Sequence, residues 1–260
     1  MKKIAFIGFG AMAQALYQGM RKQGVLNPKD VLIVELESEK AKRACNEGAR
    51  LVSLDSLDDA DMIWCCVKPQ HVDALMQSLS LNQKSVLISI VAGASLSRFE
   101  TSAKQPLVRV MPNTPAQLGK GASGVFFNDF VNLEDKDIIF KALNSVGLAI
   151  QVTEESHIDI VTALSGSGPA FFYQMVLDMI SFSKKHGFDE AQAQALLAQT
   201  LIGAGEMLKK TGKKPDELIA EVKSKGGTTE AGLNCYDEQK IGGSLKELLD
   251  ATLARAKALK

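Results

Sequence analysis

The chain has few of the residues that hold metal ions or form disulfide frameworks. It contains 4 cysteines and 3 histidines in 260 residues. The cysteines show no metal-ligand spacing, and two of them are adjacent in an apolar run, where neighbouring strand side chains point to opposite faces. They are Cys45, Cys65, Cys66 and Cys235. The histidines stand singly, as surface or capping histidines do. We therefore expect no metal site and no disulfide framework.

The chain also lacks an excess of charge of either sign. Its 30 basic and 30 acidic residues cancel, so no overall field would attract it to nucleic acid or to an anionic membrane. We expect neither a nucleic-acid nor a membrane partner. A small neutral or zwitterionic ligand is compatible with this balance.

Long apolar runs, internal repeats and low-complexity segments are missing as well. The N-terminal "MKKIAFIGFG" begins like a signal peptide, but Gly8 and Gly10 interrupt it and no apolar segment of membrane-spanning length follows. With 46% hydrophobic and 23% charged residues, the composition is that of an ordinary globular protein of one or two domains. We expect a cytoplasmic protein.

Strand and helix patterns alternate in the first half of the chain. Apolar strand candidates are "KIAFIG", "DVLIVE", "DMIWCCV", "SVLISIV", "LVRVM", "SGVFF" and "LAIQV"; helix candidates between them include "AMAQALYQGMRKQG", "QHVDALMQSLS", "LSRFETSA" and "EDKDIIFKALNSVG". This alternation predicts an α/β fold with a mainly parallel, doubly wound sheet. The strand signals then stop, so we place a domain boundary near residue 153, with a dinucleotide-binding Rossmann domain over 1–153.

The remainder, 154–260, reads as helices only. "AFFYQMVLDMISFSKKHG" and "DEAQAQALLAQTLIGAGEMLKKTG" both end at glycine, and the second begins with acidic residues and ends with lysines, as helix electrostatics favour. The first is apolar on more than one face. It is expected to be buried between domains or against another subunit; a thick monomeric core is the alternative.

A glycine-rich turn follows the first strand. Gly8, Gly10 and Ala13 form a G-x-G-x-x-A pattern between a strand and a helix, inside a βαβ unit. Small residues there allow backbone N–H groups to approach a pyrophosphate at the helix N-terminus. In this context the pattern predicts dinucleotide binding rather than a purely structural turn.

The choice between NADH and NADPH is marked by opposing charges. Glu35 ends the second strand, where a carboxylate binds the adenosine ribose and repels a 2′-phosphate, and Glu37 follows it. This weakly favours NADH. The helix that follows carries Lys40, Lys42 and Arg43, which either reach a phosphate or form a solvated helix face.

Three further loops follow predicted strands. "VKPQ" carries Lys68 and Pro69, "VAGAS" carries Gly93, and "VMPNTPA" carries Pro112 and Asn113. Because open parallel sheets bind ligands at the carboxyl ends of their strands, these loops are expected to frame one crevice, with Asn113 near the ribose or nicotinamide. Each loop alone could also be a rigid turn.

The stretch "LSGSGPAFFYQM" opens the first long helix. Its small residues from Ser165 to Gly168 precede Pro169, so we expect free N–H groups and little bulk there. No lysine follows until Lys184, which is too far along the helix to donate a proton beside a nicotinamide.

The stretch "SKGGTTEAGL" combines paired glycines with paired threonines at a helix start. Consecutive free N–H groups from Gly226 onward would form an anion nest that suits a small carboxylate. The alternative is a glycine-rich interhelical turn with threonine as the cap.

Together, "GFGAMA", "VKPQ", "VMPNTPA", "ALSGSGPAF" and "SKGGTTEAGL" resemble the pyrroline-5-carboxylate reductase family over essentially the whole chain. The resemblance implies a Rossmann domain and a C-terminal helical dimerisation domain, a homodimer, and in larger assemblies a ring of five dimers. It also implies hydride transfer from NAD(P)H, commonly NADPH, to the C=N carbon of 1-pyrroline-5-carboxylate, which gives L-proline in the last step of proline biosynthesis.

The resemblance also assigns residues. The substrate loop comprises Ser224, Gly226, Gly227, Thr228 and Thr229, with Thr229 contacting the ring nitrogen as the catalytic residue. The cofactor site comprises Gly8, Phe9, Gly10, Ala11, Met12, Glu35, Val67, Lys68, Pro69, Ala92, Gly93, Pro112 and Asn113. One departure is Lys225, which stands where the family usually has proline.

The implied chemistry asks little of side chains. A cyclic imine protonates near neutral pH to an iminium that accepts hydride directly, so the protein mainly orients two ligands and excludes water. No dedicated general acid is expected. Another imine reductase of the same architecture, or a nucleotide-sensing regulatory protein, would share the cofactor motifs.

Overall fold

The computed structural model describes residues 2–100 and 104–259. The chain divides into two compact units: one runs from the N-terminus to Pro169 and includes the chain from Ala251 onward, and the other is Ala170–Asp250. We call them the sheet unit and the helical unit, and each is described by itself. The strands stop before residue 153, and the residues from there to Pro169 still belong to the sheet unit.

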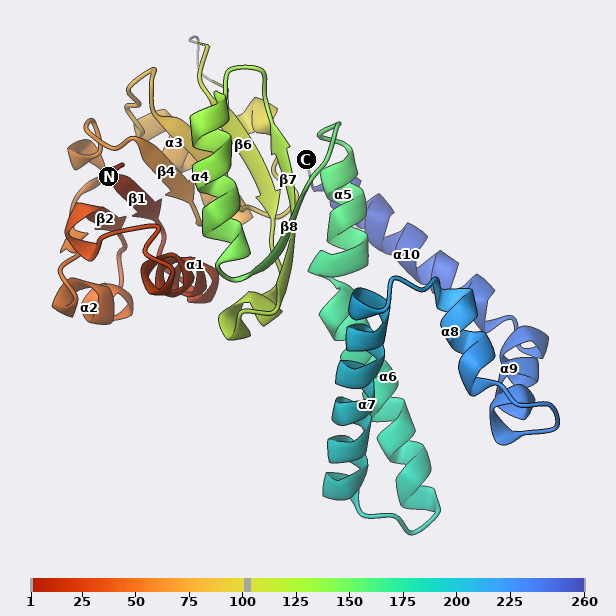
Figure 1. The fold of residues 1–260 in the computed structure, drawn as a ribbon. Coiled ribbons are helices and arrows are strands. Elements are labelled where there is room, and N and C mark those ends of the chain that lie inside the picture. Colours follow the sequence, from red (N-terminus) through yellow and green to blue (C-terminus); the bar gives the residue numbers. More distant parts are fainter. Residues whose placement is uncertain (1, 101–103, 260) are drawn as a thin grey trace. The chain divides into compact units, whose positions relative to one another are not determined.

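The sheet unit is built on an eight-stranded sheet (Figure 1). Its order is β3-β2-β1-β4-β5-β6-β7-β8. The strands are β1 (Ile4–Ile7), β2 (Val31–Val34), β3 (Arg50–Leu51), β4 (Met62–Cys65), β5 (Val86–Ser89), β6 (Leu107–Met111), β7 (Gly121–Phe127) and β8 (Gly147–Gln151). All neighbours pair in parallel except β6 and β7. The predicted mainly parallel, doubly wound sheet is confirmed.

Apolar side chains on the two faces of the sheet form two cores. Phe6 and Trp64 belong to one core, together with residues of α1 (Ala11–Lys22), α2 (Ser38–Asn46) and α4 (Leu133–Asn144). Ile63 and Phe99 belong to the other, together with Val72 of α3 (Val72–Ser78). Strands buried on both faces read as continuous apolar runs, which is why the sequence predicts them well.

The helix expected over "LSRFETSA" is not formed. Leu96–Phe99 make a single 3₁₀ turn, and Glu100 is already extended. Both ends of the turn, Leu96 and Phe99, are buried. The two apolar side chains therefore anchor a short turn in the core, and their spacing does not mark a longer helix. Residues 101–103 of the expected helix lie outside the described residues.

The stretch before Pro169 is helical rather than a free helix start. Helix α5 (His157–Val161) continues through a π-helical turn, Thr162–Gly166, into α6 (Gly168–Lys185). The expected free N–H groups are therefore not all present, because Ser167 N–H donates to the Thr162 carbonyl at 2.8 Å. Pro169 has no N–H for the Ser165 carbonyl, and its ring pushes that carbonyl away. A wide π turn accommodates both effects.

The helical unit contains the expected long helices. It is formed by α6, α7 (Glu190–Lys210), α8 (Pro215–Val222), α9 (Thr228–Glu238) and α10 (Ile241–Ala258), of which α6 begins before Ala170 and α10 extends beyond Asp250. The Asp189 side chain caps α7 by accepting a hydrogen bond from Gln192 N–H at 2.9 Å. Lysines in its last turn complement the helix dipole.

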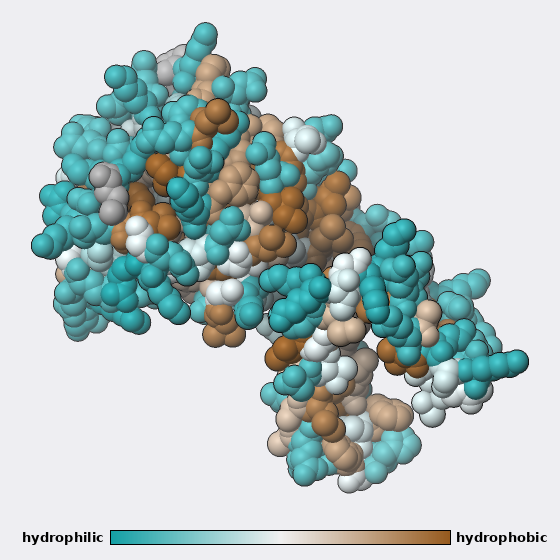
Figure 2. All heavy atoms as spheres, viewed as in Figure 1, coloured by the Kyte–Doolittle hydropathy of each residue, from teal (hydrophilic) through white to brown (hydrophobic). Residues whose placement is uncertain are grey.

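Large apolar side chains are exposed on α6 and α7, and brown patches lie among white and teal atoms on this hairpin in Figure 2. They are Phe172, Tyr173, Met175, Leu177, Met179, Phe182, Leu196, Leu201, Ile202, Met207 and Leu208. The stretch His157–Lys185 is long and apolar enough to cross a membrane by length and composition, and only 11% of its most apolar window is buried. A helix that is apolar on several faces is equally expected where it packs against another subunit.

Candidate functional site

The glycine-rich turn after β1 has room for a ligand on one side only. Gly8 has φ +82°, and a Cβ there would lie 2.9 Å from the Cys66 carbonyl oxygen, so only glycine fits. Gly10 is the N-cap of α1 and has no side-chain cap, and a Cβ there would meet no atom within 4 Å. The first-turn N–H groups of α1, including those of Ala11 and Met12, lack intrahelical acceptors. The turn therefore has both the space beside Gly10 and the free N–H groups that the predicted pyrophosphate site needs.

Glu35 is fixed against this turn. Its Oε2 accepts a hydrogen bond from Phe9 N–H at 2.7 Å, and its Oε1 accepts one from Glu37 N–H at 3.0 Å. Partial burial would raise the pKa of this carboxyl, but the hydrogen bonds from Glu37 and Phe9 N–H lower it below its ordinary value. An ionised carboxylate thus stands at the end of β2, beside the expected pyrophosphate site.

The basic residues that could reach a 2′-phosphate are all engaged with carboxylates. Lys40 Nζ lies 2.6 Å from Glu37, Lys42 Nζ lies 3.2 Å from Glu39, and Arg43 Nε lies 3.4 Å from Glu47. These pairs are exposed and individually weak. They nevertheless balance the basic charge of α2 locally.

The other expected cofactor loops follow neighbouring parallel strands. Val67 and Pro69 are half-buried and Lys68 is exposed after β4, while Ala92 and Gly93 follow β5. Gly93 has φ +75°, and a Cβ there would lie 2.5 Å from Cβ of Leu259. Leu259, which follows α10, therefore packs directly on this loop.

Asn113 has a structural role that the sequence does not indicate. Its Oδ1 accepts a hydrogen bond from Ala122 N–H at 2.9 Å, and its Nδ2 donates one to the Ser165 carbonyl at 3.1 Å. The neighbouring Pro112 is buried. The amide thereby ties the end of β6 to β7 and to the π turn. These two hydrogen bonds leave one Nδ2 hydrogen and one Oδ1 lone pair unused.

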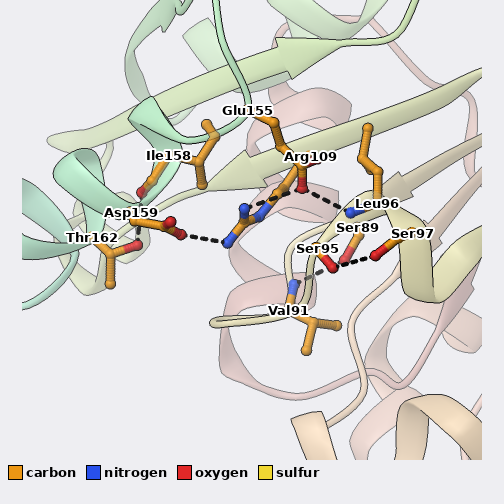
Figure 3. A network of polar contacts seen from close by, with 10 residues as sticks. All are labelled: Ser89, Val91, Ser95, Leu96, Ser97, Arg109, Glu155, Ile158, Asp159 and Thr162. Carbon is orange, nitrogen blue, oxygen red and sulfur yellow. Dashed lines mark hydrogen bonds and ion pairs between the residues drawn. The ribbon is translucent and has the colours of Figure 1, made fainter. Parts of the chain in front are cut away.

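A buried ionic network lies where β6 meets α5 (Figure 3). Arg109 of β6, with its side chain 1% exposed, donates from Nη1 to Glu155 at 3.1 Å and from Nη2 to Asp159 at 2.9 Å. Glu155 also accepts from Leu96 N–H at 2.7 Å. The network joins β6 to α5 and to the Leu96–Phe99 turn. An arginine inside the apolar run "LVRVM" is its only sequence signal.

The substrate loop lies in the helical unit, immediately before α9. Ser224–Gly227 form a β-turn in which Gly227 N–H donates to the Ser224 carbonyl at 3.0 Å. Gly226 has φ +72°, and a Cβ on Gly227 would lie 2.3 Å from Ser224 Oγ. Gly226 therefore requires glycine for its conformation, and a side chain on Gly227 would displace the Ser224 hydroxyl.

The expected anion nest starts later than the sequence indicates. Gly226 N–H is already bonded to Glu230 Oε2 at 2.7 Å, and Gly227 N–H to Ser224. The N–H groups left without intrahelical acceptors belong to the first turn of α9, at Thr228, Thr229 and Glu230.

Thr229 also faces a cavity of about 440 Å³ within the helical unit. Its walls come from α7, α8 and α9 and are almost entirely apolar. They include Met207, Leu208, Leu218, Ile219 and Leu233. Thr229 thus lies at the edge of a largely apolar space.

The expected cofactor residues belong to the sheet unit and the expected substrate loop to the helical unit, so each set is gathered within its own unit. Among residues 2–100 and 104–259, no cluster of histidine, cysteine, aspartate or glutamate side chains could hold a metal ion. The arrangement can bind a dinucleotide and a small anion through backbone N–H groups.

Family models match both units. The pyrroline-5-carboxylate reductase dimerisation family matches residues 155–259, and the coenzyme F420-dependent NADP oxidoreductase family matches residues 3–93. Together these matches cover the substrate loop and every expected cofactor residue except Pro112 and Asn113.

Full-length relatives agree. The pyrroline-5-carboxylate reductase of Pseudomonas aeruginosa is 35% identical over 99% of this chain and 96% of its own. The solved structure of a pyrroline-5-carboxylate reductase from Coxiella burnetii is 28% identical, covers 100% of this chain and 98% of its own, and has a TM-score of 0.91. The crystal structure of Plasmodium falciparum pyrroline carboxylate reductase with NADP bound is 27% identical, covers 99% of this chain and 98% of its own, and has a TM-score of 0.86. The chain belongs to the pyrroline-5-carboxylate reductase family.

Proposed function

We propose that the chain reduces 1-pyrroline-5-carboxylate to L-proline, the last step of proline biosynthesis, with a nicotinamide dinucleotide as reductant. The observation that carries this function is the Ser224–Thr229 loop. Its glycines shape a tight turn, and its threonines open α9 with unpaired N–H groups. A small cyclic imine with one carboxylate fits such a site.

The substrate carboxylate binds to the first-turn N–H groups of α9. The N–H groups of Thr228, Thr229 and Glu230 point out of the helix end. The positive end of the helix dipole adds to their attraction for an anion. No basic side chain is required for this contact.

Thr229 is the proposed catalytic residue. Its hydroxyl oxygen accepts a hydrogen bond from the protonated ring nitrogen and so orients the C=N bond. The apolar walls beside it restrict water around the reacting bond. The reduced nicotinamide, when bound, supplies the hydride. Because the iminium forms near neutral pH, no separate proton donor is needed.

The cofactor is held by the sheet unit. The N-terminus of α1 with Gly8, Phe9, Gly10, Ala11 and Met12 takes the pyrophosphate, and the loops after β4, β5 and β6 complete the site with Val67, Lys68, Pro69, Ala92, Gly93, Pro112 and Asn113. We propose that NADH is preferred over NADPH. The fixed, ionised Glu35 supports this preference, as does the pairing of each nearby basic side chain with a carboxylate.

The exposed apolar faces of α6 and α7 support a homodimer formed by the helical unit. A ring of five such dimers is the proposed larger assembly. We propose a cytoplasmic location, where the nicotinamide cofactors that the reaction needs are present.

The function is tested by following oxidation of NADH and of NADPH by the purified chain with 1-pyrroline-5-carboxylate, with a bulkier cyclic imine as control. Oxidation with 1-pyrroline-5-carboxylate, faster with NADH, is the expected result. Turnover of the bulkier imine alone would make the chain a different imine reductase. Cofactor binding without turnover of either imine would make it a nucleotide sensor.

A further inference from the structure

A carboxylate from α9 closes the substrate loop. Glu230 Oε2 accepts the Gly226 N–H at 2.7 Å, and its Oε1 lies 3.6 Å from Lys223 Nζ. The side chain of Glu230 thus connects the first turn of α9 with Gly226, the third residue of the preceding β-turn, and with Lys223, the residue before that turn. The contact therefore adds a carboxylate side chain to a loop otherwise built from glycines and threonines.

The turn that Glu230 holds is one in which proline would be favoured. Ser224–Gly227 has the hydrogen bond from its fourth N–H to its first carbonyl, and its third residue, Gly226, has φ +72°. These are the features of a type II turn, whose second position favours proline because the ring fixes φ there. In this chain that position is Lys225. Lysine does not fix φ as proline does, so the turn has more conformational freedom before substrate binds. Another contact is then needed to hold the turn in one conformation.

The charge of Glu230 strengthens its hydrogen bond to the turn. The hydrogen bond from Gly226 N–H, followed by the attraction of Lys223, lowers the pKa of the Glu230 carboxyl below its ordinary value. It is therefore ionised at neutral pH, where hydrogen bonds from N–H groups to carboxylates are strongest. With Gly226 N–H occupied, the substrate carboxylate is left to the N–H groups within α9.

We propose that Glu230 is a positioning residue that holds the 224–229 loop in its substrate-binding shape, in place of the constraint that proline at position 225 would supply. The inference rests on the proposed function, because it concerns the loop that binds the imine. A loop held in this shape aligns Thr229 and the N–H groups of α9 before the substrate arrives. The ordering cost of binding is then lower.

The test compares Glu230→Ala, Glu230→Gln and the double variant Glu230→Ala with Lys225→Pro. Glu230→Ala should raise KM for 1-pyrroline-5-carboxylate by about tenfold, the scale of one hydrogen bond to a charged group. The KM for NADH and the melting temperature should stay unchanged. Glu230→Gln should fall between it and the parent chain, because its amide oxygen still accepts the Gly226 N–H. The added proline should restore KM to within about twofold of the parent, since it fixes the same turn.

Glu238→Ala is the matched control, because it removes an exposed carboxylate from the far end of the same helix and should leave KM unchanged. An unchanged KM in Glu230→Ala overturns the proposal. So does a raised KM that proline fails to restore, because Glu230 would then act other than by shaping the turn. A lower melting temperature together with weaker cofactor binding in Glu230→Ala would also overturn the proposal, because Glu230 would then have only a general structural role. Activity of the parent chain tests the proposed function separately.

Discussion

Asn113 Nδ2 donates to the Ser165 carbonyl at 3.1 Å, and so supplies the hydrogen bond that Pro169, four residues after Ser165, lacks the N–H to give. A side chain from the end of β6 thus satisfies a carbonyl that the proline leaves unpaired in the helix. The same amide holds Ala122 of β7. The π turn is therefore anchored to the sheet.

Removing this amide should destabilise the sheet unit without preventing folding. Asn113→Ala leaves the Ser165 carbonyl and the Ala122 N–H without partners, and should cost about 1–3 kcal/mol. Asn113→Asp keeps an acceptor for Ala122 but loses the donor to Ser165, so it should also destabilise. Urea unfolding measures both. Equal stability of the Asp variant and the parent chain would contradict the contact with Ser165.

The Arg109 network should be the most sensitive ionic site of the sheet unit. Arg109→Met leaves the carboxylates of Glu155 and Asp159 without their buried cation, and should cost about 3–5 kcal/mol. Arg109→Lys should recover only part of this loss, because one ammonium cannot match the two guanidinium donors. As an exposed control, Arg43→Met should change the free energy of unfolding by no more than about 1 kcal/mol. Similar effects of Arg43→Met and Arg109→Met would contradict the buried role.

Gly8 and Gly10 should separate folding from cofactor binding. The valine side chain of Gly10→Val would extend into open space, so the melting temperature should stay unchanged. The Kd for NADH should rise about a hundredfold, the scale of two lost hydrogen bonds to a charged group. Gly8→Ala forces a side chain against the Cys66 carbonyl at positive φ, and should cost about 1–3 kcal/mol of stability. Calorimetry and thermal unfolding distinguish the two. Unchanged NADH affinity in Gly10→Val would count against the anion site.

Charge reversal at Glu37 should shift the cofactor preference. Glu37→Arg removes one carboxylate and releases Lys40, so the ratio of kcat/KM for NADPH to that for NADH should rise about fivefold, the scale of an exposed charge pair. High salt should reduce the shift. An unchanged ratio would contradict the role of Glu37, and would show that Lys40, Lys42 and Arg43, or no residue nearby, set the preference.

The sequence predicts the parts of this fold that depend on local patterns. Buried parallel strands are apolar runs of adjacent residues, and the turns at Gly8 and Gly226 need glycine because both residues have a positive φ. Both can be recognised without knowing their neighbours. The two-residue β3 and the single turn at Leu96–Phe99 are too short for such a pattern.

The contacts that hold the candidate site depend on partners far along the chain. Arg109 pairs with carboxylates 46 and 50 residues away, and Asn113 with a carbonyl 52 residues away. No local spacing indicates such pairs. Glu230 lies only four residues from Gly226. The sequence does not indicate their contact, because it depends on the conformation of the turn, which brings the Gly226 N–H within reach of the Glu230 carboxylate.

Thr229 provides the most direct test of the account. If its hydroxyl orients the ring nitrogen, Thr229→Val should lower kcat/KM for 1-pyrroline-5-carboxylate by about one to two orders of magnitude, the scale of one charge-assisted hydrogen bond. Thr229→Ala should lose as much, Thr229→Ser should keep most activity, and Thr228→Ala should be better tolerated because its N–H survives. Cofactor affinity should barely change in any of them. Activity of Thr229→Val equal to that of the parent chain would contradict the account, and would leave residues 226–229 with carboxylate binding alone.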